Sequence, residues 1–174
     1  MRFTVGVLLL AAALATLTLA RGRAEANRGP QATTARVGDS VVVRSRVYRS
    51  SASITLLKVI DPATPSYPSR LRPHRGDRWI AMRIRIRGLH GSWIDTPSSD
   101  GRVVDAHGHP VRALPSGYGT VEPRMPGSTD LSAGQVMVGN LVFELRKNAR
   151  MRKLDYIVQG GSSASWTLAP TSRS

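Results

Sequence analysis

The feature that most constrains the fold is a strict two-residue alternation from Trp79 to Arg87. The apolar residues Ile80, Met82, Ile84 and Ile86 alternate there with Ala81, Arg83, Arg85 and Arg87. A β-strand sends successive side chains to opposite faces, so four apolar side chains share one face and three arginines share the other. A helix would scatter the same residues around its circumference. The segment therefore predicts an antiparallel strand with one buried and one solvated face.

The rest of the chain alternates between short β-type runs and breaks rich in Gly, Pro, Ser and Asp. No window shows a helical period over three turns. The expected strands cover residues 40–44, 53–60, 79–87, 135–145, 154–158 and 165–168. Residues 93–94 and 103–105 are short strand candidates, and 110–112 returns from a hairpin turn at 105–108. Long Pro- or Gly-rich loops are expected over 61–78 and 115–130. This pattern predicts an all-β, immunoglobulin-like antiparallel β-sandwich of about seven strands.

The core is expected to contain apolar residues from the two clearest strands. These residues are Ile80, Met82, Ile84, Ile86, Leu141, Phe143 and Leu145. Along 135–145 the apolar residues change parity, with Val136 and Val138 on one side of Gly139 and the others on the far side. If all of them face inward, the strand needs an extra residue, so a β-bulge is predicted at Gly139.

The N-terminus predicts export. Met1-Arg2 is followed by an apolar run over 5–20 and then by small residues, which is typical of a secretory signal peptide. Cleavage fits after Ala20 or after Ala26, and an uncleaved membrane anchor is the alternative because 16 to 18 apolar residues is near the lower limit for a span. The expected organisation lists 1–26 as signal peptide or anchor, 27–36 as a flexible lead-in, 37–169 as the domain and 170–174 as a tail. The mature protein is accordingly expected to be secreted or associated with the cell envelope.

The formal charge of +14 is carried mostly by arginine, since only Lys58, Lys147 and Lys153 are lysines. GC-rich codon usage accounts for such a bias, and so does a polyanionic partner. An anionic cell-envelope polymer or lipid, or a secreted protein, is the expected partner class, and nucleic acid is not expected. The chain has no cysteine, which excludes disulfides, thiolate metal sites and the lipid-carrying cysteine of a lipoprotein.

The candidate ligand-binding residues are Arg83, Arg85 and Arg87, which share one strand face about 7 Å apart. Guanidinium groups bind phosphate and carboxylate in a bidentate manner, so this row could bind an anion. The alternative is a solvated face whose arginines pair with carboxylates such as Glu144 or Asp155.

Two further groups of residues, one of histidines and one of aromatic residues, each have a functional and a structural interpretation. His107 and His109 could bind Cu or Zn, but only His74 and His90 could add imidazole ligands, so a polar hairpin tip is expected and no metal site is predicted. An aromatic platform for sugars would require four side chains that are otherwise expected in or near the core, namely Trp79, Trp93, Trp166 and Tyr118.

No motif indicates catalysis. The chain has no Gly-x-Ser-x-Gly elbow, no His-Glu-x-x-His pair and no phosphate-binding glycine loop before a helix. Its acidic residues are few and stand singly, so no acid/base carboxylate pair is indicated. No catalytic residue and no cofactor are therefore predicted. A non-catalytic binding or adhesion module is expected, with an accessory domain that recruits a protein through its sheet, or an unrecognised enzyme, as alternatives.

Several segments, in this order, resemble a known family. They are Gly38-Asp39, the strand over 76–86, the hairpin turn Asp105–Gly108, the segment Leu131–Leu145 and the strand at 154–156. Together they resemble the secreted, single-domain immunoglobulin-like proteins of Gram-positive bacteria, a domain of unknown function in the structural group of the mycobacterial immunoprotective extracellular protein. The resemblance spans 37–168 and departs from the family at Gly88, where Asn is common, and over 88–93. It implies a fold and an exported location, and no activity.

Overall fold

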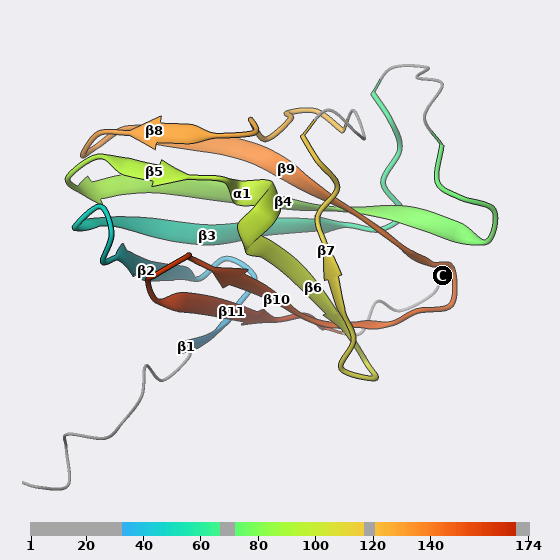
Figure 1. Cartoon of the computed structure of the whole chain (residues 1–174). Helices are drawn as coiled ribbons and strands as arrows, with labels where there is room; N and C mark the ends of the chain where they lie inside the picture. The colour runs from blue at the N-terminus through green and yellow to red at the C-terminus, as the bar shows by residue number, and fades with distance from the viewer. Residues whose placement is uncertain (1–32, 67–71, 117–120, 170–174) are drawn as a thin grey trace, which may run out of the picture. The chain divides into compact units, whose positions relative to one another are not determined.

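The computed structural model describes residues 33–66, 72–116 and 121–169 (Figure 1). The predicted signal segment and the tail lie outside these ranges. The described elements are β1 (Thr33–Arg36), β2 (Ser40–Ser45), β3 (Ser50–Ile60), β4 (Asp77–His90), β5 (Trp93–Asp95), α1 (Pro97–Asp100), β6 (Gly101–Asp105), β7 (Pro110–Arg112), β8 (Thr129–Leu131), β9 (Val136–Arg146), β10 (Met151–Ile157) and β11 (Ser163–Thr167). No described helix is long and apolar enough to cross a bilayer.

The strands form two main sheets and one small one. One main sheet has the order β1-β11-β10-β6-β7, the other β2-β3-β4-β9, and β5 pairs with β8. All pairs are antiparallel except β1 with β11. Figure 1 shows the two main sheets as separate layers. The all-β sandwich is confirmed, but the expected count of about seven strands is too low for the eleven described.

The core lies between the two main sheets. All seven residues predicted to be buried are at most 4% exposed. The opposite sheet contributes Val103, Leu154, Tyr156 and Trp166, which are fully buried. The alternation along β4 is thus explained by one apolar face packing against a second sheet.

The three tryptophans are buried, with Trp79 at 3% and Trp93 and Trp166 at 0% exposure. Trp93 and Trp166 belong to the main core, and Trp79 belongs to a smaller apolar cluster. None of them is available to a surface ligand, as expected for side chains in or near the core. Tyr118 lies outside the described ranges.

A smaller apolar cluster covers part of the outer face of the β4–β9 sheet. Ala63 and Val121, from two connecting segments, pack there against Trp79, Ala81 and Val142. These strand residues point away from the main core and are buried by loops instead. The apolar covering ends at Ala81; beyond it Arg83 is half-buried, and Arg85 and Arg87 are exposed.

The predicted β-bulge at Gly139 is wrong. β9 pairs with β4 in unbroken register, with Ile84 opposite Gly139 and Ile86 opposite Met137. Val136 and Val138 point outward and are 52% and 39% exposed. The parity change in the sequence reflects two exposed valines, which a protein surface tolerates, and not an extra residue.

The lead-in expected over 27–36 is also partly wrong. Residues Thr33–Arg36 form β1, which pairs in parallel with β11. Ala35 of this strand is 6% exposed and belongs to the core. Four residues are too few to show a period, and only the pairing with a strand about 130 residues away in sequence orders them.

Candidate anion-binding face and neighbouring polar sites

The three predicted arginines lie on the outer side of β4, beyond its apolar covering, with Arg83 half-buried and Arg85 and Arg87 exposed. Strand pairing places Ser53 and Val136 on either side of Arg87, and Thr55 and Val138 on either side of Arg85. Directly paired residues of antiparallel strands project to the same side of the sheet. We call this surface the arginine face; its residues are Ser53, Thr55, Arg83, Arg85, Arg87, Val136, Val138 and Asn140.

The guanidinium groups differ in how firmly the protein holds them. Arg83 donates from Nε to Asn140 Oδ1 at 3.3 Å and from an Nη to the carbonyl of Glu122 at 3.2 Å. Arg85 donates to Thr55 Oγ1 at 3.4 Å, a long contact. Within the described ranges, Arg87 makes no side-chain hydrogen bond. Arg85 and Arg87 are exposed and therefore keep most of their donors for another molecule.

No described carboxylate neutralises this row. Within 4 Å of the three guanidinium groups the described residues offer no acidic oxygen, since the ion pairs of this domain lie elsewhere. Glu144 pairs with His74 at 2.6 Å, and Asp155 pairs with Lys153 at 2.8 Å. The two carboxylates considered as partners in the sequence are thus engaged by other groups, and the arginine face carries uncompensated positive charge.

A second polar site is a cavity of about 190 Å³ beside α1. Its lining includes Asp95 and Asp100, together with hydroxyl groups of Ser45, Thr96 and Ser99. Asp95 is 6% exposed and accepts hydrogen bonds at Oδ2 from Trp93 Nε1, at 3.2 Å, and from the Tyr156 hydroxyl. Burial raises the pKa of Asp100 to about 8, with further contributions from its hydrogen bond to Asp95 and the charge of that residue. Near neutral pH this carboxyl therefore keeps its proton.

The buried Tyr156 is affected by the same carboxyl pair. Burial, followed by the charge of Asp95, raises the pKa of Tyr156 well above its ordinary value. The hydroxyl thus remains a hydrogen-bond donor to Asp95 over the physiological range.

The histidine pair lies at the hairpin tip between β6 and β7. The ring centroids of His107 and His109 are 6.1 Å apart. Asp105 accepts the backbone N–H groups of both residues at 2.8 Å, and these contacts, led by that of His109, lower its pKa. His109 Nδ1 lies 3.1 Å from the same carboxylate. The histidines therefore belong to a turn ordered by Asp105, as expected for a hairpin tip.

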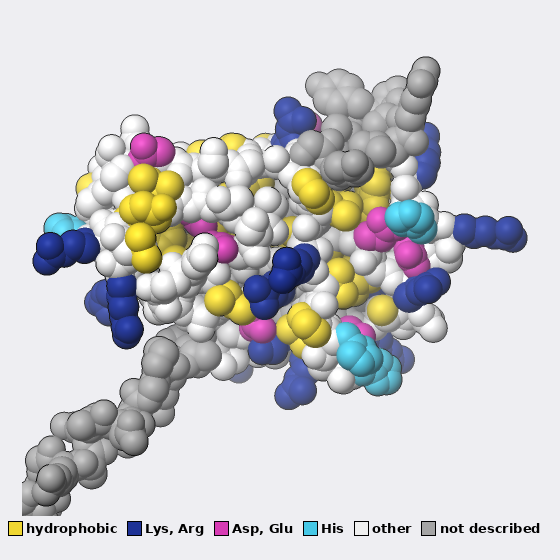
Figure 2. Space-filling model, in the orientation of Figure 1, with side chains coloured by type: hydrophobic (Ala, Val, Ile, Leu, Met, Phe, Trp, Pro, Cys, Tyr) yellow, Lys and Arg dark blue, Asp and Glu magenta, His cyan; other side chains and the backbone are white. Residues whose placement is uncertain are grey.

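A different cluster combines His74, Asp77 and Glu144 at the end of the sheet where β4 begins and β9 ends. Burial acts to raise the pKa of Glu144, but hydrogen bonds from the backbone and ring of His74 outweigh it and lower that pKa. Figure 2 shows histidine against acidic side chains at this end of the molecule. On the face shown, Lys and Arg side chains are scattered, with most at the edges and one group near the middle.

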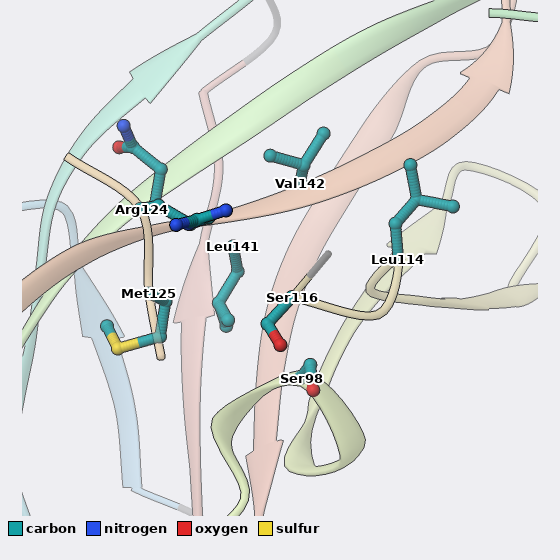
Figure 3. A pocket seen from close by; sticks show the side chains of 8 residues that line it. Ser98, Leu114, Ser116, Arg124, Met125, Leu141 and Val142 are labelled. Carbon is teal, nitrogen blue, oxygen red and sulfur yellow. The ribbon is translucent and has the colours of Figure 1, made fainter. Parts of the chain in front are cut away.

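One further hollow lies between α1, the segment over 114–116 and β9 (Figure 3). Ser98 and Ser116 face it from one side, and Met125 and Leu141 border it. Its volume of about 10 Å³ suffices for a single water molecule. It is not a ligand site.

Sequence reasoning placed the arginine row but missed both carboxylate-containing clusters. The segment Asp95-Thr-Pro-Ser-Ser-Asp100 carries one usable signal, since a proline after threonine favours a helical turn and such a turn brings residues 95 and 100 close together. The His74 cluster depends on a residue 70 positions away and has no local signal.

No family model matches the sequence, and no curated protein matches it. Solved structures do. The secreted protein MPT63 of Mycobacterium tuberculosis superposes with a TM-score of 0.57 at 14% identity, over 80% of this chain and all of MPT63. The yjhA protein of Bacillus subtilis gives 0.55 at 11% identity, over 78% and 99% of the two chains. An uncharacterised β-sandwich protein of Clostridium difficile gives 0.51 at 8% identity, over 81% and 97%. The chain therefore shares the β-sandwich fold of MPT63 and of uncharacterised proteins from Gram-positive bacteria.

Proposed function

We propose that this chain is an exported, non-catalytic, immunoglobulin-like module that binds an anionic polymer of the cell envelope through the arginine face. The observation that carries the proposal is the row formed by Arg83, Arg85 and Arg87, which no described carboxylate neutralises. An unpaired row of guanidinium groups attracts phosphate or carboxylate groups and binds them in a bidentate manner.

The sheet sets the spacing of the row. Alternate residues of one strand lie about 7 Å apart, and β4 is held by neighbours on both sides along this stretch. A rigid row loses less conformational freedom on binding than arginines on a loop would. A polymer with a negative charge on each repeating unit is the ligand that such a row can engage at several points together.

The neighbouring residues suit a polar polymer. Ser53 on β3 adds a half-buried hydroxyl group beside Arg87. Thr55, beside Arg85, is buried and hydrogen-bonded to Ser40, so it supports the face from below. Val136 and Val138 on β9 add an exposed apolar strip on the other side. The Ser53 hydroxyl can bind the uncharged part of a repeating unit, and the valines can pack against its carbon backbone.

The export part of the proposal is supported by the N-terminal apolar run and by the likeness to MPT63, which is a secreted protein. Loss of residues 1–26 removes three arginines and one glutamate, which leaves a formal charge of +12 from +14. An exported domain with this charge is attracted to anionic surfaces at long range.

The test compares two triple variants with equal charge change. R83Q/R85Q/R87Q removes the row, and R112Q/R150Q/R152Q removes three exposed arginines elsewhere on the domain. Long-chain inorganic polyphosphate is the soluble probe, and isolated cell walls are the native one. We expect the first variant to lose at least tenfold in affinity for both and the second to lose less than threefold.

Equal losses in the two variants would show that binding follows net charge alone. Unchanged binding of R83Q/R85Q/R87Q would refute the proposal. Thermal unfolding of each variant provides the folding control. R112Q/R150Q/R152Q should unfold close to the parent, since exposed substitutions of this kind each change stability by about 0.5 kcal/mol or less. R83Q/R85Q/R87Q should be less stable by about 1 kcal/mol or more, because Arg83 is half-buried and loses its hydrogen bonds to Asn140 and to the Glu122 carbonyl.

A further inference from the structure

The cluster at the start of β4 has the composition of a metal-binding site. His74, Asp77 and Glu144 each offer one ligand atom, and these atoms all lie within 4.8 Å of one another. One imidazole nitrogen and two carboxylate oxygens form a mixed donor set. Within the described ranges this is the only such group of three.

Backbone contacts hold the three residues together. Asp77 is the first residue of β4, and its N–H donates to the carbonyl of His74 at 2.9 Å, which closes a tight turn. Strand pairing places Asp77 opposite Arg146, two residues beyond Glu144 on β9. The backbone N–H of His74 donates to Glu144 Oε1 at 2.5 Å. The turn is thus tied to the end of β9 before any ion is considered.

A second, independent observation concerns Asp77, because one of its carboxylate oxygens lacks a hydrogen-bond donor. Its Oδ1 is buried and accepts no hydrogen bond from the described residues. Its ion pair with Arg146 Nε is long, at 3.5 Å, and the Arg146 side chain is 75% exposed. A buried carboxylate oxygen without a donor costs about 1–3 kcal/mol, more for a charged group, and a bound cation would relieve that cost.

We propose that His74, Asp77 and Glu144 bind a divalent transition-metal ion of the zinc type. Zinc accepts nitrogen and oxygen ligands at about 2.0–2.2 Å, which places tetrahedral ligand atoms about 3.4 Å apart. His74 Nδ1 and Glu144 Oε1 are now 2.6 Å apart and must separate slightly, while Asp77 moves closer. His74 is 86% exposed and free to make that adjustment. Three protein ligands leave a fourth position for water or for a group of another molecule.

The chemistry of the donor set determines the selectivity. Calcium and magnesium require oxygen ligands, six or more for calcium, whereas imidazole favours zinc and its transition-metal neighbours. An excess of calcium or magnesium should therefore leave zinc binding unchanged. Arg146 competes with the ion for Asp77, so its removal should favour the ion.

The experiment is isothermal titration of the untagged protein with zinc chloride. The parent should bind one equivalent. H74A, which alters an exposed side chain and preserves the fold, should weaken binding at least tenfold, and the isosteric D77N should do the same. R146Q should tighten binding about threefold. H107A/H109A removes two exposed histidines outside the proposed site and should bind zinc like the parent.

Three results would overturn the inference: no heat of binding up to millimolar zinc, loss of binding in H107A/H109A with retention in H74A, or competition by calcium at equal concentration. Loss of affinity in D77N is read together with its thermal unfolding curve, and H74A gives the answer where D77N is unstable. None of these results depends on polyphosphate binding.

Discussion

Replacement of Gly139 by alanine tests the close approach that defines one edge of the arginine face. A Cβ at this position would lie 2.6 Å from Met125 Cα and 2.8 Å from Met125 N. Both atoms belong to the backbone and cannot rotate away. The segment around Met125 must therefore move outward from β9.

The loss of stability follows from the hydrogen bonds of Asn140 that this movement weakens. Asn140 N–H donates to the Pro123 carbonyl at 2.7 Å, and the Asn140 side-chain amide donates to the Val121 carbonyl at 2.9 Å. Overpacking costs about 1–3 kcal/mol, and each weakened hydrogen bond adds about 1 kcal/mol. We expect a loss of about 2–4 kcal/mol in the free energy of unfolding. For a domain of this size that corresponds to about 6–12 °C in Tm.

Urea denaturation and calorimetry of Gly139→Ala measure this loss. Val138→Ala is the matched control in the same strand, because its side chain is 39% exposed and should cost about 0.5 kcal/mol or less. Arg83 contacts Asn140 and Glu122, so Gly139→Ala should also weaken polyphosphate binding. A loss below 1 kcal/mol would refute the claim that Gly139 is required by the packed backbone of Met125.

Three further predictions concern the core and the carboxyl pair. Ile84→Ala empties a fully buried position and should cost about 2–5 kcal/mol in chemical denaturation, whereas Val42→Ala, on a side chain that is 51% exposed, should cost about 0.5 kcal/mol or less. Trp166→Phe removes the 3.0 Å hydrogen bond from the indole to the Asp39 carbonyl and some packing, and should cost about 1–3 kcal/mol, seen as a lower Tm. The pKa of Asp100 is raised to about 8 in the folded state from 3.8, so the folded protein binds this proton more tightly and loses stability as the pH rises from 4 through 8. Asp100→Asn should therefore stabilise the protein more at pH 8 than at pH 5, by about 1 kcal/mol after allowance for partial exposure; an equal effect at both pH values would contradict this assignment.

The features of the fold that depend on local periodicity could be predicted from the sequence. The alternation from Trp79 to Arg87 predicted both the strand and the side of the arginines, because Arg83 to Arg87 pair with strands on both sides and their side chains point away from the core. It did not predict that loops bury Trp79 and Ala81 on the same outer side. The same reasoning failed at Gly139, since exposed valines in β9 resemble core residues when only their type is considered. The requirement for glycine there comes from Met125, whose approach no local pattern encodes.

Long-range pairing explains the remaining differences. β1 and β8 are three or four residues long and exist because β11 and β5 offer partners for their backbone groups. Asp77 and Glu144 lie 67 positions apart and meet only through the pairing of β4 with β9. The sequence shows that these residues are acidic, but only the folded structure shows that they lie close together.

The salt dependence of polyphosphate binding tests the central claim most directly. Three phosphate contacts should give a slope of about −2 in a plot of log K against log salt concentration, which is roughly a 16-fold loss of affinity between 50 and 200 mM salt. R83Q/R85Q/R87Q should reduce this slope to near zero, and R112Q/R150Q/R152Q should leave it near −2. Equal slopes in the parent and in R83Q/R85Q/R87Q would contradict the assignment of the arginine face as the binding surface.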